Sequence, residues 1–143
     1  MRKSVLVLLT FATLLTVSCK KDTEETQAVT KENIAGSYMV GSIKAQVSGS
    51  PEQDVTNDYF EACEIDDVVT LKTDLTYVHT DAGAQCSPST NESGEWNLSG
   101  TTSFIMDGET FAIKSWNGKQ LVLTQTDNSS GMTATFTTTL EKQ

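Results

Sequence analysis

The sharpest constraint on the fold is a two-residue alternation near the C-terminus. One face of this segment carries Met132, Ala134, Phe136, Thr138 and Leu140, and the other carries Thr133, Thr135, Thr137 and Thr139. Successive side chains of a strand point to opposite faces, so this pattern predicts a half-buried antiparallel strand.

Earlier segments repeat the same alternation. They are Tyr38–Val47, Val68–Lys72, Thr76–Asp81, Gly94–Leu98, Ser103–Met106, Thr110–Trp116 and Gln120–Thr126. Asp107-Gly108 and Asn117-Gly118 are strong signals for tight hairpins. Only Thr30–Ile34 reads as a helical turn, with Thr30 as its N-cap and Gly36 as its stop. We therefore predict an all-β domain of eight antiparallel strands, either an up-and-down barrel or a sandwich. The barrel is favoured because closure removes exposed edges.

Bulky apolar side chains dominate the predicted interior. The interior candidates are Tyr38, Val40, Val69, Leu71, Tyr77, Trp96, Leu98, Phe104, Met106, Phe111, Ile113, Leu121, Leu123, Met132 and Phe136. An eight-stranded barrel is either filled by side chains or holds one small ligand. With so many rings inside, a shallow pocket is favoured over a deep one.

The N-terminus has the pattern of a secretory signal that ends at a lipidated cysteine. Arg2 and Lys3 precede an apolar run that is too short to span a bilayer and that ends at Ser18-Cys19. This resembles a bacterial lipobox, although Thr16 stands where Leu is usual. We predict a signal peptide over residues 1–18, diacylglycerol on Cys19, a flexible tether over residues 19–31 and a barrel domain over residues 32–143.

Charge restricts the partners of the mature chain. Cleavage removes two of ten basic residues and no acid, so 125 residues remain with 8 basic and 19 acidic side chains, a net charge of −11. This charge repels nucleic-acid phosphates, and no basic stripe offsets it. Membrane attachment is therefore expected through the N-terminal lipid alone.

The two remaining cysteines, Cys63 and Cys86, suit a disulfide because an exported protein folds in an oxidising compartment. Two free thiols are the alternative, and a metal pair is disfavoured because no CxxC motif or histidine cluster accompanies them.

A long acidic connection, Ser48–Ala62, interrupts the short turns and carries Tyr59 and Phe60. Long loops are often functional, and these rings either pack on the core or cover a ligand. His79 is the only histidine, and it shares the interior face with Tyr77.

Catalytic patterns are missing from the sequence. A Ser-His-Asp site lacks the Gly-x-Ser-x-Gly elbow, and all three cysteines have other roles. Asp66 and Asp67 are expected on opposite faces of a strand, which does not suit a glycosidase. No metal, cofactor or enzymatic activity is expected.

An ordered set of short motifs resembles the lipocalin-like domain of small Gram-negative lipoproteins. The motifs are Ile34-Ala35-Gly36-Ser37-Tyr38, Cys63 to Leu71, Thr73-Asp74-Leu75-Thr76-Tyr77, Cys86, Gly94-Glu95-Trp96-Asn97-Leu98, Leu121-Val122-Leu123 and the threonine-lined last strand. The resemblance covers roughly Ile34 to Leu140 and implies an eight-stranded lipocalin-like barrel. Two positions depart from the family pattern. Tyr38 replaces the tryptophan that plugs the barrel floor, and Leu75 replaces a turn glycine.

We predict an outer-membrane lipoprotein, facing the periplasm or the cell surface, that binds a small apolar or amphipathic ligand at the barrel mouth, under the Ser48–Ala62 loop. The residues predicted to contact that ligand are Tyr38, Tyr59, Phe60, Tyr77 and His79. The alternatives are a solid-core surface adaptor or assembly protein, and an inhibitor of a secreted hydrolase.

Overall fold

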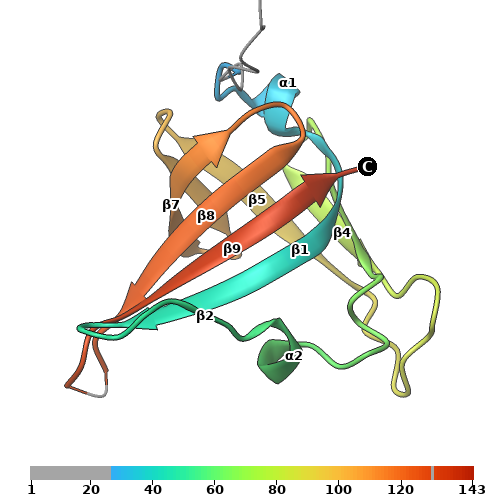
Figure 1. The fold of residues 1–143 in the computed structure, drawn as a ribbon. Coiled ribbons are helices and arrows are strands. Elements are labelled where there is room, and N and C mark those ends of the chain that lie inside the picture. The colour runs from blue at the N-terminus through green and yellow to red at the C-terminus, as the bar shows by residue number, and fades with distance from the viewer. Residues whose placement is uncertain (1–26, 130) are drawn as a thin grey trace, which may run out of the picture.

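The computed structural model describes residues 27–129 and 131–143 (Figure 1). The predicted signal peptide, the lipidation at Cys19 and most of the predicted tether lie outside this part of the chain. Two short helices are present, α1 (Lys31–Ile34) and α2 (Thr56–Tyr59). The strands are β1 (Gly36–Val47), β2 (Gln53–Asp54), β3 (Val68–Leu71), β4 (Thr76–Thr80), β5 (Glu92–Ser99), β6 (Ser103–Met106), β7 (Glu109–Trp116), β8 (Gln120–Asp127) and β9 (Ala134–Lys142).

Eight of these strands close an antiparallel barrel. Each strand from β3 to β8 pairs with the next one along the chain. β1 pairs with β3 on one side and with β9 on the other, which closes the barrel. The two-residue β2 attaches to β1 beyond this ring. The predicted up-and-down barrel is therefore confirmed, and the sandwich is ruled out.

The two ends of the barrel differ (Figure 1). We call one end the floor, which comprises α1 and the turns at residues 72–75, 100–102 and 117–119. The opposite end is the mouth, which comprises α2 and the loop residues 48–67, 81–91, 107–108, 128–129 and 131–133. The turns at the floor are short, whereas the mouth has the long loops, so a binding site is expected at the mouth.

Packed aromatic side chains fill the floor half of the barrel. The fully buried core comprises Ile34, Tyr38, Leu71, Tyr77, Trp96, Phe104, Trp116, Leu121 and Leu123. Trp96 stacks on Phe104 at 5.9 Å, and its indole N–H donates to the carbonyl of Lys72 at 2.9 Å. Interiors packed in this way leave little space for a guest.

Tyr38 lies at the floor, where the resemblance places the plug residue. It is fully buried, and its hydroxyl donates to the carbonyl of Ile34. The Lys142 ammonium lies over the rings of Tyr38 and Trp116, 5.8 and 5.3 Å from their centroids. It also donates to the carbonyls of Asn33 and Ala35 at 2.8 and 2.7 Å, so it fixes α1 across the floor.

Helix α1 begins and ends as the sequence predicts. The Thr30 hydroxyl accepts from the Asn33 amide at 3.2 Å, which satisfies one of the free N–H groups of the first turn. Ala35 has an extended backbone, and Gly36 follows at φ +149°, a region that only glycine enters readily.

The interior differs from the predicted list at three buried apolar residues and one exposed one. Ile34, Ile43 and Trp116 are buried and were not predicted to be so, whereas Met132 is 60% exposed and precedes β9. Bulges explain two of these differences. The register shifts between Val40 and Ser42 in β1 and between Ile113 and Ser115 in β7. A bulge moves the inward position by one residue, which turns Ile43 and Trp116 into the barrel.

Asp66 and Asp67 also differ from expectation, because they precede β3 in a turn rather than lying on a strand. No helix within residues 27–129 and 131–143 is long and apolar enough to cross a membrane.

Candidate functional site

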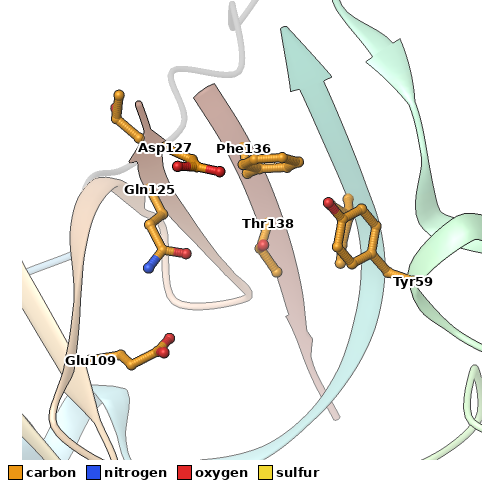
Figure 2. Close-up of a pocket in the computed structure, with 8 residues that line it drawn as sticks. Tyr59, Glu109, Gln125, Asp127, Phe136 and Thr138 are labelled. Atoms are coloured by element: carbon orange, nitrogen blue, oxygen red, sulfur yellow. The ribbon is translucent and has the colours of Figure 1, made fainter. Parts of the chain in front are cut away.

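A hollow of about 480 Å³ opens at the mouth, which is a usual size for a small-molecule site (Figure 2). Its walls come from α2 and from strands β1, β7, β8 and β9. The lining residues are Ile43, Tyr59, Glu109, Gln125, Thr126, Asp127, Phe136 and Thr138. The hollow therefore lies between the packed floor and the open end of the barrel. This position agrees with the shallow pocket predicted from the sequence.

One wall of the hollow is apolar. Tyr59 meets Phe136 edge to face, with 5.7 Å between their ring centroids, and 56% of Tyr59 remains exposed. Ile43 is buried beside them, opposite Thr138 in the β1–β9 pairing. This wall offers aromatic and aliphatic surface to an apolar group.

The position of Tyr59 follows from the attachment of α2 to β1. The Thr56 hydroxyl accepts from the Ile43 amide at 2.8 Å, and the Val55 amide donates to the Ile43 carbonyl at 2.9 Å. Asp54 accepts from both the amide and the hydroxyl of Thr56, and these bonds hold the pKa of Asp54 below its usual range. These bonds hold the start of α2 against β1, which places Tyr59 at the wall of the mouth.

The opposite wall is polar. Glu109 and Gln125 face Tyr59 across the hollow, and Asp127 lies at the end of β8 (Figure 2). Asp127 accepts from the amide of Ser129 at 2.7 Å and from its hydroxyl at 3.0 Å. These two bonds lower the pKa of Asp127, which keeps the carboxylate ionised.

A second hollow of about 330 Å³ adjoins the first one through Glu109. Its lining residues are Tyr77, Glu92, Met106, Asp107, Glu109 and Phe111. The Tyr77 hydroxyl donates to the Asp107 carboxylate. Burial, followed by this bond, raises the pKa of Tyr77, whereas the same bond and the Glu95 amide lower the pKa of Asp107. Gly94 permits this pair, because a Cβ there would collide with both side chains.

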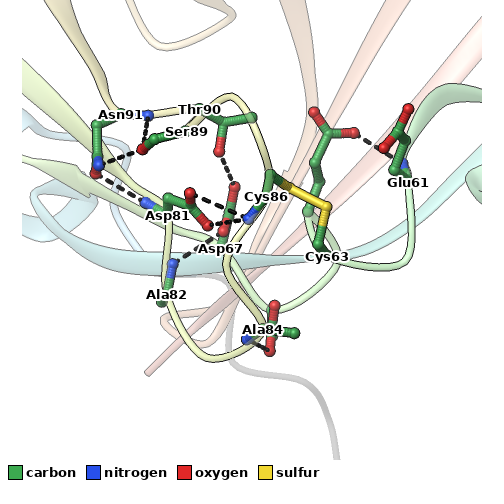
Figure 3. Close-up of a disulfide and its surroundings, with 12 residues drawn as sticks. Glu61, Cys63, Asp67, Asp81, Ala82, Ala84, Cys86, Ser89, Thr90 and Asn91 are labelled. Carbon is green, nitrogen blue, oxygen red and sulfur yellow. Dashed lines mark hydrogen bonds between the residues drawn. A yellow bond between two sulfur atoms is a disulfide. The ribbon is translucent and has the colours of Figure 1, made fainter.

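The predicted disulfide between Cys63 and Cys86 is confirmed. It joins the β1–β3 loop to the β4–β5 loop at the mouth, with 5.4 Å between the two Cα atoms (Figure 3). Cys86 is further held by its amide, which donates to both carboxylate oxygens of Asp81 at 3.1 and 3.2 Å.

Asp66 and Asp67 organise the same pair of loops, a role that the sequence did not indicate. Asp67 is 4% exposed and accepts from the Ala82 amide at 3.0 Å and the Thr90 hydroxyl at 2.8 Å. Asp66 accepts from the Ala84 amide at 3.0 Å. These two carboxylates therefore hold the β4–β5 loop against the segment that precedes β3.

His79 lies among loop carboxylates. Its Nε2 is 3.1 Å from Asp67, and its Nδ1 is 3.7 Å from Glu92. It lines neither hollow. No group of three or more His, Cys, Asp or Glu residues within the described ranges is arranged to hold a metal ion.

The five residues predicted to contact a ligand do not come together at one place. Tyr59 lines the larger hollow and Tyr77 the smaller one, whereas Phe60 lines neither and Tyr38 lies at the floor. A role for each in ligand contact stays a prediction.

Glu109, Gln125 and Asp127 line the larger hollow and were not predicted. The alternation contained a signal for Gln125 and Asp127, because the inward face that carries Leu121 and Leu123 continues to positions 125 and 127.

Comparison with known proteins gives one match. The lipocalin-like domain family matches residues 34–130, well over half of the chain. No curated protein and no solved structure matches the chain significantly. The match covers β1 to β8 and agrees with the closed barrel described above. The chain belongs to the lipocalin-like domain family.

Proposed function

We propose that this protein is a non-enzymatic, lipid-anchored binding protein of the outer membrane that holds a small amphipathic ligand at the barrel mouth. The observation that carries the binding role is the hollow of about 480 Å³, which has an apolar wall at Tyr59 and Phe136 and a polar wall at Glu109 and Gln125. A site with both kinds of wall suits a molecule with an apolar body and a polar end. Anchoring rests on the sequence up to Cys19. The acidic chain repels the phosphates of nucleic acid, so no nucleic-acid partner is proposed.

The packed floor supports a shallow binding mode. Trp96, Trp116 and Phe104 fill the barrel beneath the hollow, so a guest enters the mouth and stops there. The same packing is the one observation that favours the adaptor alternative, in which the barrel binds no small molecule.

A titration distinguishes these two functions. A fluorescent fatty-amine probe is added to the mature protein and to its Tyr59→Ala variant. Ile65→Ala is the control, because Ile65 is also exposed, at 36%, but lines neither mouth hollow. We expect binding by the parent and the control, and binding at least about fivefold weaker by Tyr59→Ala, since the lost ring contacts are worth about 1 kcal/mol. Absence of binding by the parent would favour the adaptor.

A further inference from the structure

The charge of the mouth identifies the class of ligand, given the proposed function. Four carboxylates line the two adjoining hollows. They belong to Glu92, Asp107, Glu109 and Asp127. Among the described residues, no lysine or arginine lines either hollow. The site therefore presents negative charge to a guest, and an anionic headgroup such as a fatty-acid carboxylate would be repelled.

The described lysines lie away from these hollows. Lys31 and Lys142 lie at α1 and the end of β9, and Lys72 and Lys119 lie in the floor turns. Lys114 lies in the floor half of β7, and Lys44 pairs with Glu52 at 3.7 Å. Positive charge is thus concentrated at the floor and negative charge at the mouth, which steers cations towards the mouth.

Glu109 is the carboxylate that is best placed for a guest. It borders both hollows, and its side chain makes no hydrogen bond or ion pair within the described part of the chain, although its backbone pairs with Met106. Asp107 and Asp127, in contrast, already accept bonds from Tyr77 and Ser129. A cationic group in the hollow would supply the partner that Glu109 lacks.

The aromatic wall provides a surface for the apolar part of such a cation. The exposed ring of Tyr59 and the ring of Phe136 face Glu109 and Gln125 across the larger hollow (Figure 2). Aromatic side chains offer a large apolar surface, so this wall can hold an alkyl chain. An alkylammonium satisfies both walls, whereas a fatty acid satisfies only one.

We propose that the mouth binds an amphipathic cation, namely an organic amine whose ammonium group contacts Glu109 and Asp127 while its apolar part lies against Tyr59, Phe136 and Ile43. This inference rests on the proposed function and adds the charge class of the ligand.

The test compares three probes with the same apolar tail by calorimetric titration of the mature protein: decylamine, decanol and decanoate. Decylamine and decanoate are kept below their micelle concentrations, decanol is kept below its solubility limit, and all three are used at low salt. We expect decylamine to bind at least about tenfold more tightly than decanoate, with decanol between them. Raising the salt concentration should narrow this difference, since exposed charges are screened.

Two charge-matched variants locate the effect. Glu109→Gln should weaken decylamine binding about fivefold, the effect of one charge at about 4 Å in water, and leave decanol unchanged. Glu32→Gln is the control, because it removes the same charge from exposed α1 at the floor. Urea unfolding of both variants verifies that they fold.

The outcomes separate the two proposals. If none of the probes binds, the proposed function fails. If all three bind equally, or if Glu32→Gln weakens decylamine as much as Glu109→Gln does, the barrel still binds small molecules but the cation site is wrong.

Discussion

Trp96 and Phe136 should differ sharply in their contribution to stability, because one lies in the packed floor and the other at the open mouth. Both face the barrel interior, and the sequence alone gives them the same status. Trp96 is 1% exposed, stacks on Phe104 and donates to the Lys72 carbonyl, whereas Phe136 is half-buried and lines the hollow. Substitution of each by alanine therefore tests the division between floor and mouth.

The expected magnitudes follow from burial. A buried tryptophan removes roughly 200 Å² from water, and its truncation costs about 3 to 5 kcal/mol. Trp96→Ala also leaves the Lys72 carbonyl without its donor, which adds about 1 kcal/mol, so we expect a loss of about 4 to 6 kcal/mol. Phe136→Ala removes about half of a buried ring from a site that water can fill, so about 1 to 1.5 kcal/mol is expected.

Urea unfolding followed by circular dichroism measures both losses. The chain has two tryptophans, so Trp116 remains as the fluorophore in Trp96→Ala and provides a second probe of unfolding. A loss of about 4 to 6 kcal/mol is roughly a quarter or more of the stability of a typical domain. If Trp96→Ala does not fold, Trp96→Phe keeps a ring on Phe104 and should cost about 1 to 2 kcal/mol. Equal losses for Trp96→Ala and Phe136→Ala would refute the reasoning.

Three further predictions concern the mouth and the anchor. Replacing Cys63 and Cys86 together by serine should cost about 3.4 kcal/mol in urea unfolding, from the chain entropy of a 23-residue separation, and a loss below about 1 kcal/mol would contradict this. Tyr77→Phe should raise the pKa of Asp107 towards its ordinary value in a carboxyl NMR titration, because it removes the main cause of the lowered pKa. The stabilisation by that hydrogen bond is present above the unfolded pKa of 3.8 and is lost as the pH falls through the lower folded pKa. The stability gap between parent and Tyr77→Phe should therefore shrink in acid. Cys19→Ser should leave an uncut precursor or a soluble form, so recovery of this variant in washed membranes would argue against lipidation.

The period-two alternation predicted most of the fold because each strand has one buried and one exposed face. Ser103–Met106 was predicted with its observed ends, and the other strands differ from expectation by two residues at most. The alternation fails where a bulge changes its phase. Gly41 lies at the β1 bulge, and a glycine inside a strand is a signal for one. The β7 bulge between Ile113 and Ser115 contains no glycine, so its effect on Trp116 had no local signal.

The mouth was predicted less completely than the strands, because its contacts join residues far apart in the chain. The disulfide followed from the expected compartment, but the bonds from Asp67 to Ala82 and Thr90 depend on the packing of two loops. Tyr38 was grouped with the ligand residues because it faces inward, and an inward position does not tell the floor from the mouth. That distinction depends on the direction of the strand, since β1 begins at the floor and ends at the mouth.

The two halves of the barrel place different demands on the same strands. β8 contributes Leu121 and Leu123 to the packed floor, and two residues further along the same inward face it contributes Gln125 and Asp127 to the hollow. β7 shows the reverse order, with Glu109 at the mouth and Trp116 at the floor. The floor supplies burial, so the mouth can carry exposed carboxylates that contribute little to packing. Substitutions that alter the charge of the mouth should therefore change ligand preference with little loss of stability, and this separation is what makes Glu109→Gln a clean test of the amine site.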